Sequence, residues 1–143
     1  MIEVVNRQRR RKINRERWLE FGEIALQAIG KDGEHATIVF VSNDAIRKLN
    51  RAFRAKNAAT DVLSFPAEQA AFERAQGSSL GDVVISIEQA GRQAKEHRLS
   101  FENEIAQLIL HGLLHLSGYD HETDQGEMNR LELRLRKRLG IEG

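Results

Sequence analysis

The chain lacks cysteine altogether, which excludes disulfides and thiolate metal sites. Aromatic residues make up only 6%, so the sequence offers no strong surface for stacking nucleic-acid bases. No apolar run approaches membrane-spanning length, and residues 1–5 do not have the charged-then-apolar layout of a signal peptide. We therefore expect a cytoplasmic protein with no membrane partner.

The 143 residues, 41% hydrophobic and 30% charged, suit one ordinary globular domain with its own core, and we predict a single domain over 1–143. The net charge is only +1, but it is unevenly spread: residues 7–17 hold seven basic side chains against Glu16. Such runs attract phosphates, although many are only solvated faces. The RNA-binding candidates in this run are Arg9, Arg10, Arg11 and Lys12.

Hydrophobic periodicity predicts an α+β fold: a small mixed four-stranded sheet covered by about five helices. Pro66, the only proline, should stand at a strand end or edge, and residues 67–79 should form a loop, with a helical turn around 70–75. Gly91 should interrupt its helix, while Asp124 and Glu127 resemble a capping box that opens the final helix. The predicted strands are 2–6, 35–41, 60–65 and 81–87, and the predicted helices are 14–29, 44–53, 88–98, 101–117 and one that follows 124–127.

Three of the five histidines fall within residues 111–121, at the end of the predicted central, buried helix. His111 and His115 are four residues apart, so both imidazoles lie on one helical face. Gly118 can end the helix and turn the chain so that His121 approaches the same point. Single histidines are often satisfied core residues, but burying three imidazoles is costly unless they share a partner. Three histidine ligands with an open fourth position are typical of a catalytic zinc site.

The same spacing is the frame of the metzincin proteases, which need a glutamate directly after the first histidine as general base. Gly112 occupies that position, so a peptidase is disfavoured while the metal site is retained. The general base stays unassigned among Asp61, Asp82 and Asp120. For Asp120 we predict a supporting role, in which its carboxylate orients a metal-binding imidazole.

Two motifs carry a family resemblance: His-Gly-x-Leu-His-Leu-x-Gly-Tyr-Asp-His at 111–121 and Thr-Asp-Val-Leu-Ser-Phe-Pro at 60–66. With Arg54 and the segments 49–50 and 80–82, they stand in the order found in the YbeY-type endoribonucleases, bacterial ribosomal RNA maturation factors, which the chain resembles over essentially its whole length. Ser117 and Ala59 depart from the usual leucine and proline, and the basic run is heavier than expected.

The resemblance implies a single-strand-specific, metal-dependent endoribonuclease acting in 16S rRNA 3′ processing and in small-subunit maturation and quality control. It implies one divalent ion, Zn²⁺, held by His111, His115 and His121, with Arg54, His111 and His115 as catalytic residues. Arg54 can grip two phosphate oxygens with its planar guanidinium, and Lys56 in the same basic loop is a further RNA-binding candidate.

The implied partners are 16S rRNA, the small ribosomal subunit with its proteins, and an associated GTPase, and no DNA is expected. Two alternatives stay open. One is a non-catalytic ribosome-assembly factor with a structural metal, and the other is a metallopeptidase with an atypical base.

Overall fold

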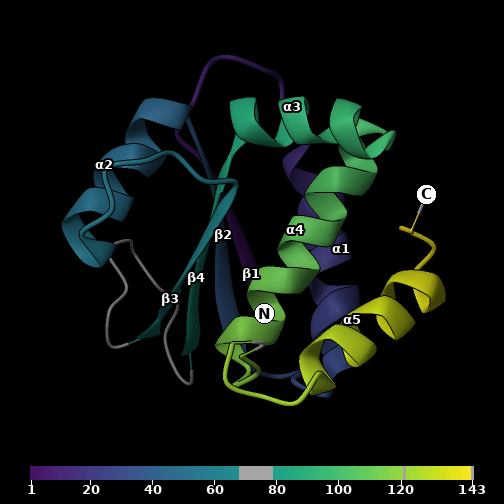
Figure 1. Cartoon of the computed structure of the whole chain (residues 1–143). Coiled ribbons are helices and arrows are strands. Elements are labelled where there is room, and N and C mark those ends of the chain that lie inside the picture. The colour runs from purple at the N-terminus through teal and green to yellow at the C-terminus, as the bar shows by residue number, and fades with distance from the viewer. Residues whose placement is uncertain (68–78, 121, 143) are drawn as a thin grey trace.

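A computed structural model describes residues 1–67, 79–120 and 122–142. Within these residues, four strands form one sheet and five helices pack around it (Figure 1). The α+β class and the mixed sheet predicted from the sequence are confirmed. The strands are β1 (Ile2–Asn6), β2 (His35–Val41), β3 (Val62–Pro66) and β4 (Ser79–Ser86), and the helices are α1 (Arg15–Ile29), α2 (Asn43–Arg54), α3 (Ile87–His97), α4 (Phe101–Leu116) and α5 (Glu127–Arg138).

The sheet has the strand order β1-β2-β4-β3. The pairs β1–β2 and β2–β4 are parallel, whereas β3 runs antiparallel to β4 at the edge of the sheet. Pro66 is the last residue of this edge strand, as predicted. An edge position suits proline because its nitrogen cannot donate to a neighbouring strand.

Both faces of the sheet are covered, so the inner strands β2 and β4 are buried at nearly every position instead of alternating between buried and exposed. Ile38, Phe40 and Ile85 belong to the larger core, which the sheet forms with α1, α3, α4 and α5. Val39 and Val84 belong to a smaller core with α2. Figure 1 shows α2 alone on one side of the sheet and the other helices gathered on the opposite side.

The central helix α4 lies within the larger core and contacts β3, β4, α1, α3 and α5. It begins where the Ser100 side chain accepts a hydrogen bond from the Asn103 backbone N–H at 3.0 Å, as the sequence predicted for an N-cap. Gly112 lets the helix approach β4 closely, because a Cβ built there would lie 2.5 Å from Cγ1 of Val83. The backbone of α4 is therefore fixed against the sheet beside both of its histidines.

Several boundaries differ from the predicted ones. β3 begins at Val62 instead of Thr60, since the Asp61 carboxylate accepts a hydrogen bond from the Val62 N–H at 2.8 Å and closes a local turn. The helix α3 continues through Gly91 without interruption. The predicted helical turn at 70–75 lies outside the described residues.

The predicted capping box at the start of α5 is wrong. The N-cap is Gly126, in a left-handed conformation with φ of 96°, and it makes no side-chain capping bond. Asp124 still accepts a hydrogen bond from the Met128 N–H at 2.9 Å, but from a position outside the helix. In the part of the chain that the structure describes, no helix combines the length and apolar character needed to cross a bilayer.

Candidate metal and phosphate site

His111 and His115 lie one turn apart near the C-terminal end of α4, as their spacing predicted. Their ring centroids are 4.8 Å apart and the ring planes are inclined at 72°. Both rings line the same cavity, of about 440 Å³, which opens between α4 and the edge strand β3. The helix therefore presents two imidazoles to one solvent-accessible space.

Two cationic side chains from the far side of β3 line the same cavity. Arg54 is the last residue of α2, and its Nη2 donates a hydrogen bond to the Ser64 carbonyl of β3 at 3.0 Å. Ala55 follows with φ of 57°, which turns the chain and carries Lys56 to the cavity. The structure thus brings both predicted cations of this loop to the two histidines.

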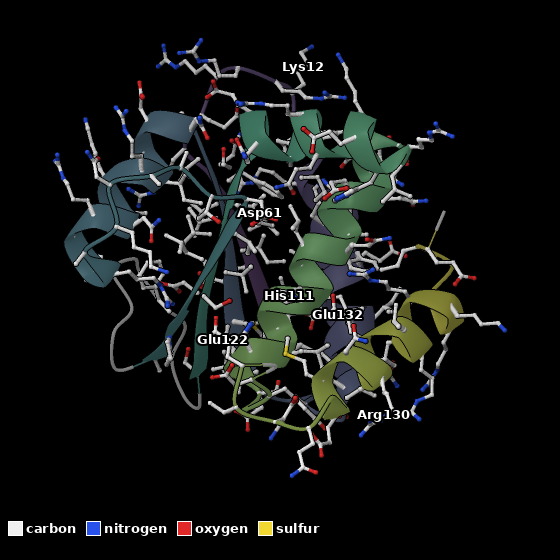
Figure 2. The ribbon with its side chains drawn as sticks, in the orientation of Figure 1. Lys12, Asp61, His111, Glu122, Arg130 and Glu132 are labelled. Atoms are coloured by element: carbon white, nitrogen blue, oxygen red, sulfur yellow. The ribbon has the colours of Figure 1, made fainter. Side chains whose placement is uncertain are left out.

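Glu132 on α5 contacts His111, and the sequence did not predict this contact. Its Oε1 accepts a hydrogen bond from Nδ1 of His111 at 2.9 Å, and its Oε2 accepts one from Nη2 of Arg136 at 2.7 Å. Figure 2 shows Glu132 reaching from α5 toward His111 on α4. The sequence spacing could have indicated this residue. Glu132 stands four residues after Met128 and three before Leu135, so it places a charge on the buried face of α5.

The Glu132 carboxylate is 8% exposed. Burial alone would raise the pKa of Glu132, but the hydrogen bond and charge of His111, together with Arg136, hold it below its ordinary value. The carboxylate is therefore ionised at neutral pH and serves as an acceptor only. A neutral His111 must then carry its proton on Nδ1, which leaves Nε2 as the nitrogen with a lone pair.

This arrangement fits a bound metal ion. Metal-binding histidines usually donate their other ring N–H to a carboxylate, which fixes the tautomer and the ring orientation. Imidazole nitrogens without thiolates suit a divalent ion such as Zn²⁺. The described residues contain no group of three or more His, Cys, Asp or Glu side chains arranged around one point. The third predicted ligand, His121, lies outside them.

The aspartates considered as a general base lie at different places in the structure. Asp82 precedes Val83, which faces Gly112 of α4, so strand alternation directs Asp82 to the opposite face of the sheet. Asp61 is engaged with the Val62 N–H and the Thr60 hydroxyl at the start of β3. These positions favour Asp61 as a structural turn residue and place Asp82 away from the histidines.

Asp120 lines the histidine cavity, and its Oδ1 accepts a hydrogen bond from the Glu122 N–H at 2.9 Å. The orienting role proposed for Asp120 stays a prediction, since its sequence neighbour His121 is not described. Tyr119 packs against the larger core, in agreement with the packing role preferred from the sequence.

The four basic residues 9–12 do not join this site. Their loop is organised by Gln8, whose Oε1 accepts hydrogen bonds from the backbone N–H groups of Arg10 and Arg11. The Arg11 guanidinium lies 3.6 Å from the ring centroid of Phe101, the first residue of α4. At the helical rise of about 1.5 Å per residue, Phe101 and His115 are about 20 Å apart. Figure 2 accordingly shows Lys12 at the top of the molecule, away from His111 on α4.

Comparison with known proteins supports the resemblance found in the motifs. The family model described as "Endoribonuclease YbeY" matches residues 3–140. An "Endoribonuclease YbeY" of Geobacter metallireducens is 36% identical over 141 residues, covering 98% of this chain and 94% of that protein. One of Nautilia profundicola is 47% identical over 104 residues, covering 73% of this chain and 71% of that protein.

A solved structure shares the fold. The solution structure of TM1509 from Thermotoga maritima matches with a TM-score of 0.62 at 27% sequence identity, and the match covers 98% of this chain and 90% of that chain. The family match therefore extends over both the histidine helix and the Arg54 loop. The chain belongs to the YbeY endoribonuclease family.

Proposed function

We propose that this protein is a metal-dependent endoribonuclease that cleaves single-stranded RNA. The observation that carries the proposal is one cavity, lined by Arg54 and Lys56 on one side and by His111 and His115 on the other, in a chain of the YbeY family. A phosphodiester needs cations at its non-bridging oxygens and groups that handle protons at its bridging oxygens. The cavity supplies the cations through Arg54 and Lys56, and its two imidazoles can hold a divalent ion, while the proton-handling group stays unassigned.

Within the proposal, His111 and His115 hold one divalent ion, Zn²⁺, and His121 joins them as third ligand on the strength of the sequence spacing alone. A zinc ion bound there supplies Lewis-acid chemistry. Glu132 supports the ion from α5 by fixing the tautomer and orientation of His111.

Arg54 is the proposed phosphate-binding residue. Its guanidinium carries five N–H donors in a planar fork, and one of them is bound to the Ser64 carbonyl. In the described part of the chain no carboxylate forms an ion pair with Arg54, so its charge is available to a substrate. Lys56 adds a second cation to the same cavity.

The peptidase alternative loses further support from the packing of Gly112. The residue directly after the first histidine cannot be glutamate, because even its Cβ would lie 2.5 Å from the buried side chain of Val83. A general base of the metzincin kind therefore has no room in this fold.

We further propose that the substrate is 16S rRNA near its 3′ end, in the cytoplasm, and that the protein acts on the small ribosomal subunit with subunit proteins and an associated GTPase. This part of the proposal is supported by the motif resemblance and by the family match.

The test is cleavage of an end-labelled single-stranded RNA that spans the 16S 3′ junction. Zinc-loaded protein, chelated protein, Arg54→Ala and Arg51→Ala are compared, each after a check of folding by circular dichroism. Arg51 is an exposed arginine of the same helix that does not line the cavity, so its variant is the matched control.

We expect chelation to abolish cleavage, Arg54→Ala to lower kcat/KM on the order of 100-fold, and Arg51→Ala to leave it unchanged. A DNA of the same sequence should remain uncut. Cleavage that survives chelation would reject the metal-dependent mechanism. Absence of cleavage by every preparation, with tight binding to small subunits, would favour the non-catalytic assembly factor.

A further inference from the structure

A second cavity, of about 510 Å³, adjoins the histidine site. His111 and Val62 line both cavities, so the two spaces meet at the ring of His111. The second cavity extends along α4 toward its N-terminus, between α3 and α5, and reaches Glu104. Figure 2 labels three of its lining residues, Asp61, His111 and Glu132.

The two cavities differ in charge. The first contains the cations Arg54 and Lys56 and an equal number of carboxylates, those of Asp120 and Glu122. In the second, four carboxylates line the wall, and Arg136 is already bound to one of them. A phosphate is therefore favoured in the first cavity over the second, where carboxylates outnumber the cations. The four carboxylates belong to Asp61, Glu104, Glu132 and Glu142.

Glu104 is the most informative of these side chains. It is only 3% exposed, and its Oε1 accepts a hydrogen bond from Nδ1 of His97 at 2.8 Å. Its other oxygen accepts no hydrogen bond from the described residues, and it does not count among their buried side-chain atoms that lack a partner, so it is accessible from the adjoining cavity. A ligand N–H group in the adjoining cavity can therefore donate to this oxygen, and a hydrogen bond to a charged, mostly buried carboxylate is stronger than one between neutral groups.

We propose that the second cavity binds the base of the nucleotide next to the scissile phosphate, and that it prefers guanine. The proposal rests on the proposed function, since the phosphate held by Arg54 would deliver the neighbouring base to the cavity. Guanine carries N–H donors on two adjacent ring positions, which match a carboxylate acceptor such as Glu104. Val62 and Leu108 supply apolar surface for the faces of the base.

The same reasoning disfavours uracil. Its pairing edge has a single N–H group between two carbonyl oxygens, and both oxygens would face carboxylates. Hydrogen bonds to the base edge are a general means by which proteins read single-stranded RNA. A good bidentate pair discriminates against the wrong base by roughly tenfold or more.

The first test is binding and does not depend on turnover. Guanosine monophosphate and uridine monophosphate are titrated into 15N-labelled protein, and the backbone amide shifts of α3 and α4 are followed by NMR. We expect guanosine monophosphate to bind about tenfold more tightly and to shift amides near Glu104 and His97. Equal affinities, or shifts confined to the Arg54 loop, would overturn the proposal.

The variants are Glu104→Gln and, as matched control, Glu96→Gln, an exposed glutamate of α3 that lines neither cavity. Glutamine keeps the shape but presents an amide with one acceptor and a donor group. Glu104→Gln should reduce the guanine-over-uracil ratio to near one, and Glu96→Gln should preserve it. An unchanged ratio in folded Glu104→Gln would reject the assignment.

Should Glu104→Gln fail to fold, Gln93→Trp carries the test, because Gln93 is a partly exposed residue that lines the cavity. The larger side chain should weaken guanosine monophosphate binding at least tenfold, and retained binding would overturn the proposal.

Cleavage of RNAs that differ only in the base beside the cut is the second readout. Loss of cleavage with guanine-selective binding intact would contradict the proposed function and leave the base site standing.

Discussion

Among single residues, Glu132 makes the contact on which His111 depends. The carboxylate fixes the ring through a 2.9 Å hydrogen bond and is itself held by Arg136. We expect Glu132→Gln to weaken Zn²⁺ binding by roughly 10- to 100-fold, as is usual when such a supporting carboxylate is lost. Competition with a chromophoric chelator measures the affinity. Glu127→Gln, an exposed change on the same helix, should leave it unaltered, and equal affinities for all three proteins would show that Glu132 does not orient the ring.

The lowered pKa of Glu132 also predicts a pH dependence of stability in metal-free protein. A carboxylate whose pKa is lower in the folded state stabilises the fold above its unfolded pKa, ordinarily about 4.5, and loses this contribution as the pH falls through the folded value. The stability difference between wild type and Glu132→Gln should therefore shrink as the pH drops below about 4.5. Urea unfolding at a series of pH values measures it, and a difference that grows in acid would contradict the assignment.

The histidine pair could be predicted because spacing alone fixes which residues share a helical face. Glu132 could not, because its contact with His111 depends on how α5 crosses α4, and no local pattern encodes that crossing. Arg54 was found through the motif, but its bond to the Ser64 carbonyl depends on the position of β3 beside α2. Side-chain contacts between different helices and strands are therefore the part of the site that the sequence could not predict.

At the level of elements, two glycines inside helices have opposite roles. A Cβ at Gly112 would meet Val83 at 2.5 Å, whereas a Cβ at Gly91 would meet only an arginine side chain at 3.8 Å. We expect Gly112→Ala to lower the free energy of unfolding by about 1–3 kcal/mol through overpacking. Gly91→Ala should raise it by about 0.5–1 kcal/mol through helix propensity.

Urea unfolding of the two alanine variants beside wild type checks this pair. A Gly112→Ala protein as stable as Gly91→Ala would mean that α4 can move away from β4, and with it the histidines. The sequence predicted Gly91 as an interruption because propensity is a local quantity. The packing of α3 against its neighbours is sufficient to keep the helix continuous.

At the scale of the whole molecule, the length of α4 decides which RNAs can reach both basic regions. It separates the basic loop from the histidine cavity by about 20 Å. A short oligonucleotide can occupy the cavity alone, whereas only a longer RNA can reach both. We expect the triple variant Arg9→Gln, Arg10→Gln, Lys12→Gln to bind long RNA more weakly. The slope of log affinity against log salt concentration, which is negative, should become shallower by about 2. Arg11 is kept because it packs on Phe101.

Fluorescence anisotropy with short and long single-stranded RNAs at several salt concentrations measures both effects. The affinity for the short RNA should be the same in wild type and variant. Equal losses for the two lengths would show that the basic run acts by overall charge, and no loss for either would leave it as a solvated surface.

The helix α4 contacts three other helices and two strands, and most of its residues are buried. We expect the buried stretch from Glu104 to Leu110 to exchange its backbone amide hydrogens mainly through opening of the whole domain, so the helix that carries the histidines should be about as persistent as the fold. A ligand that binds the histidines only in the folded state therefore stabilises the whole domain against unfolding. In a cell, the amount of this protein that escapes proteolysis would follow the supply of that ligand.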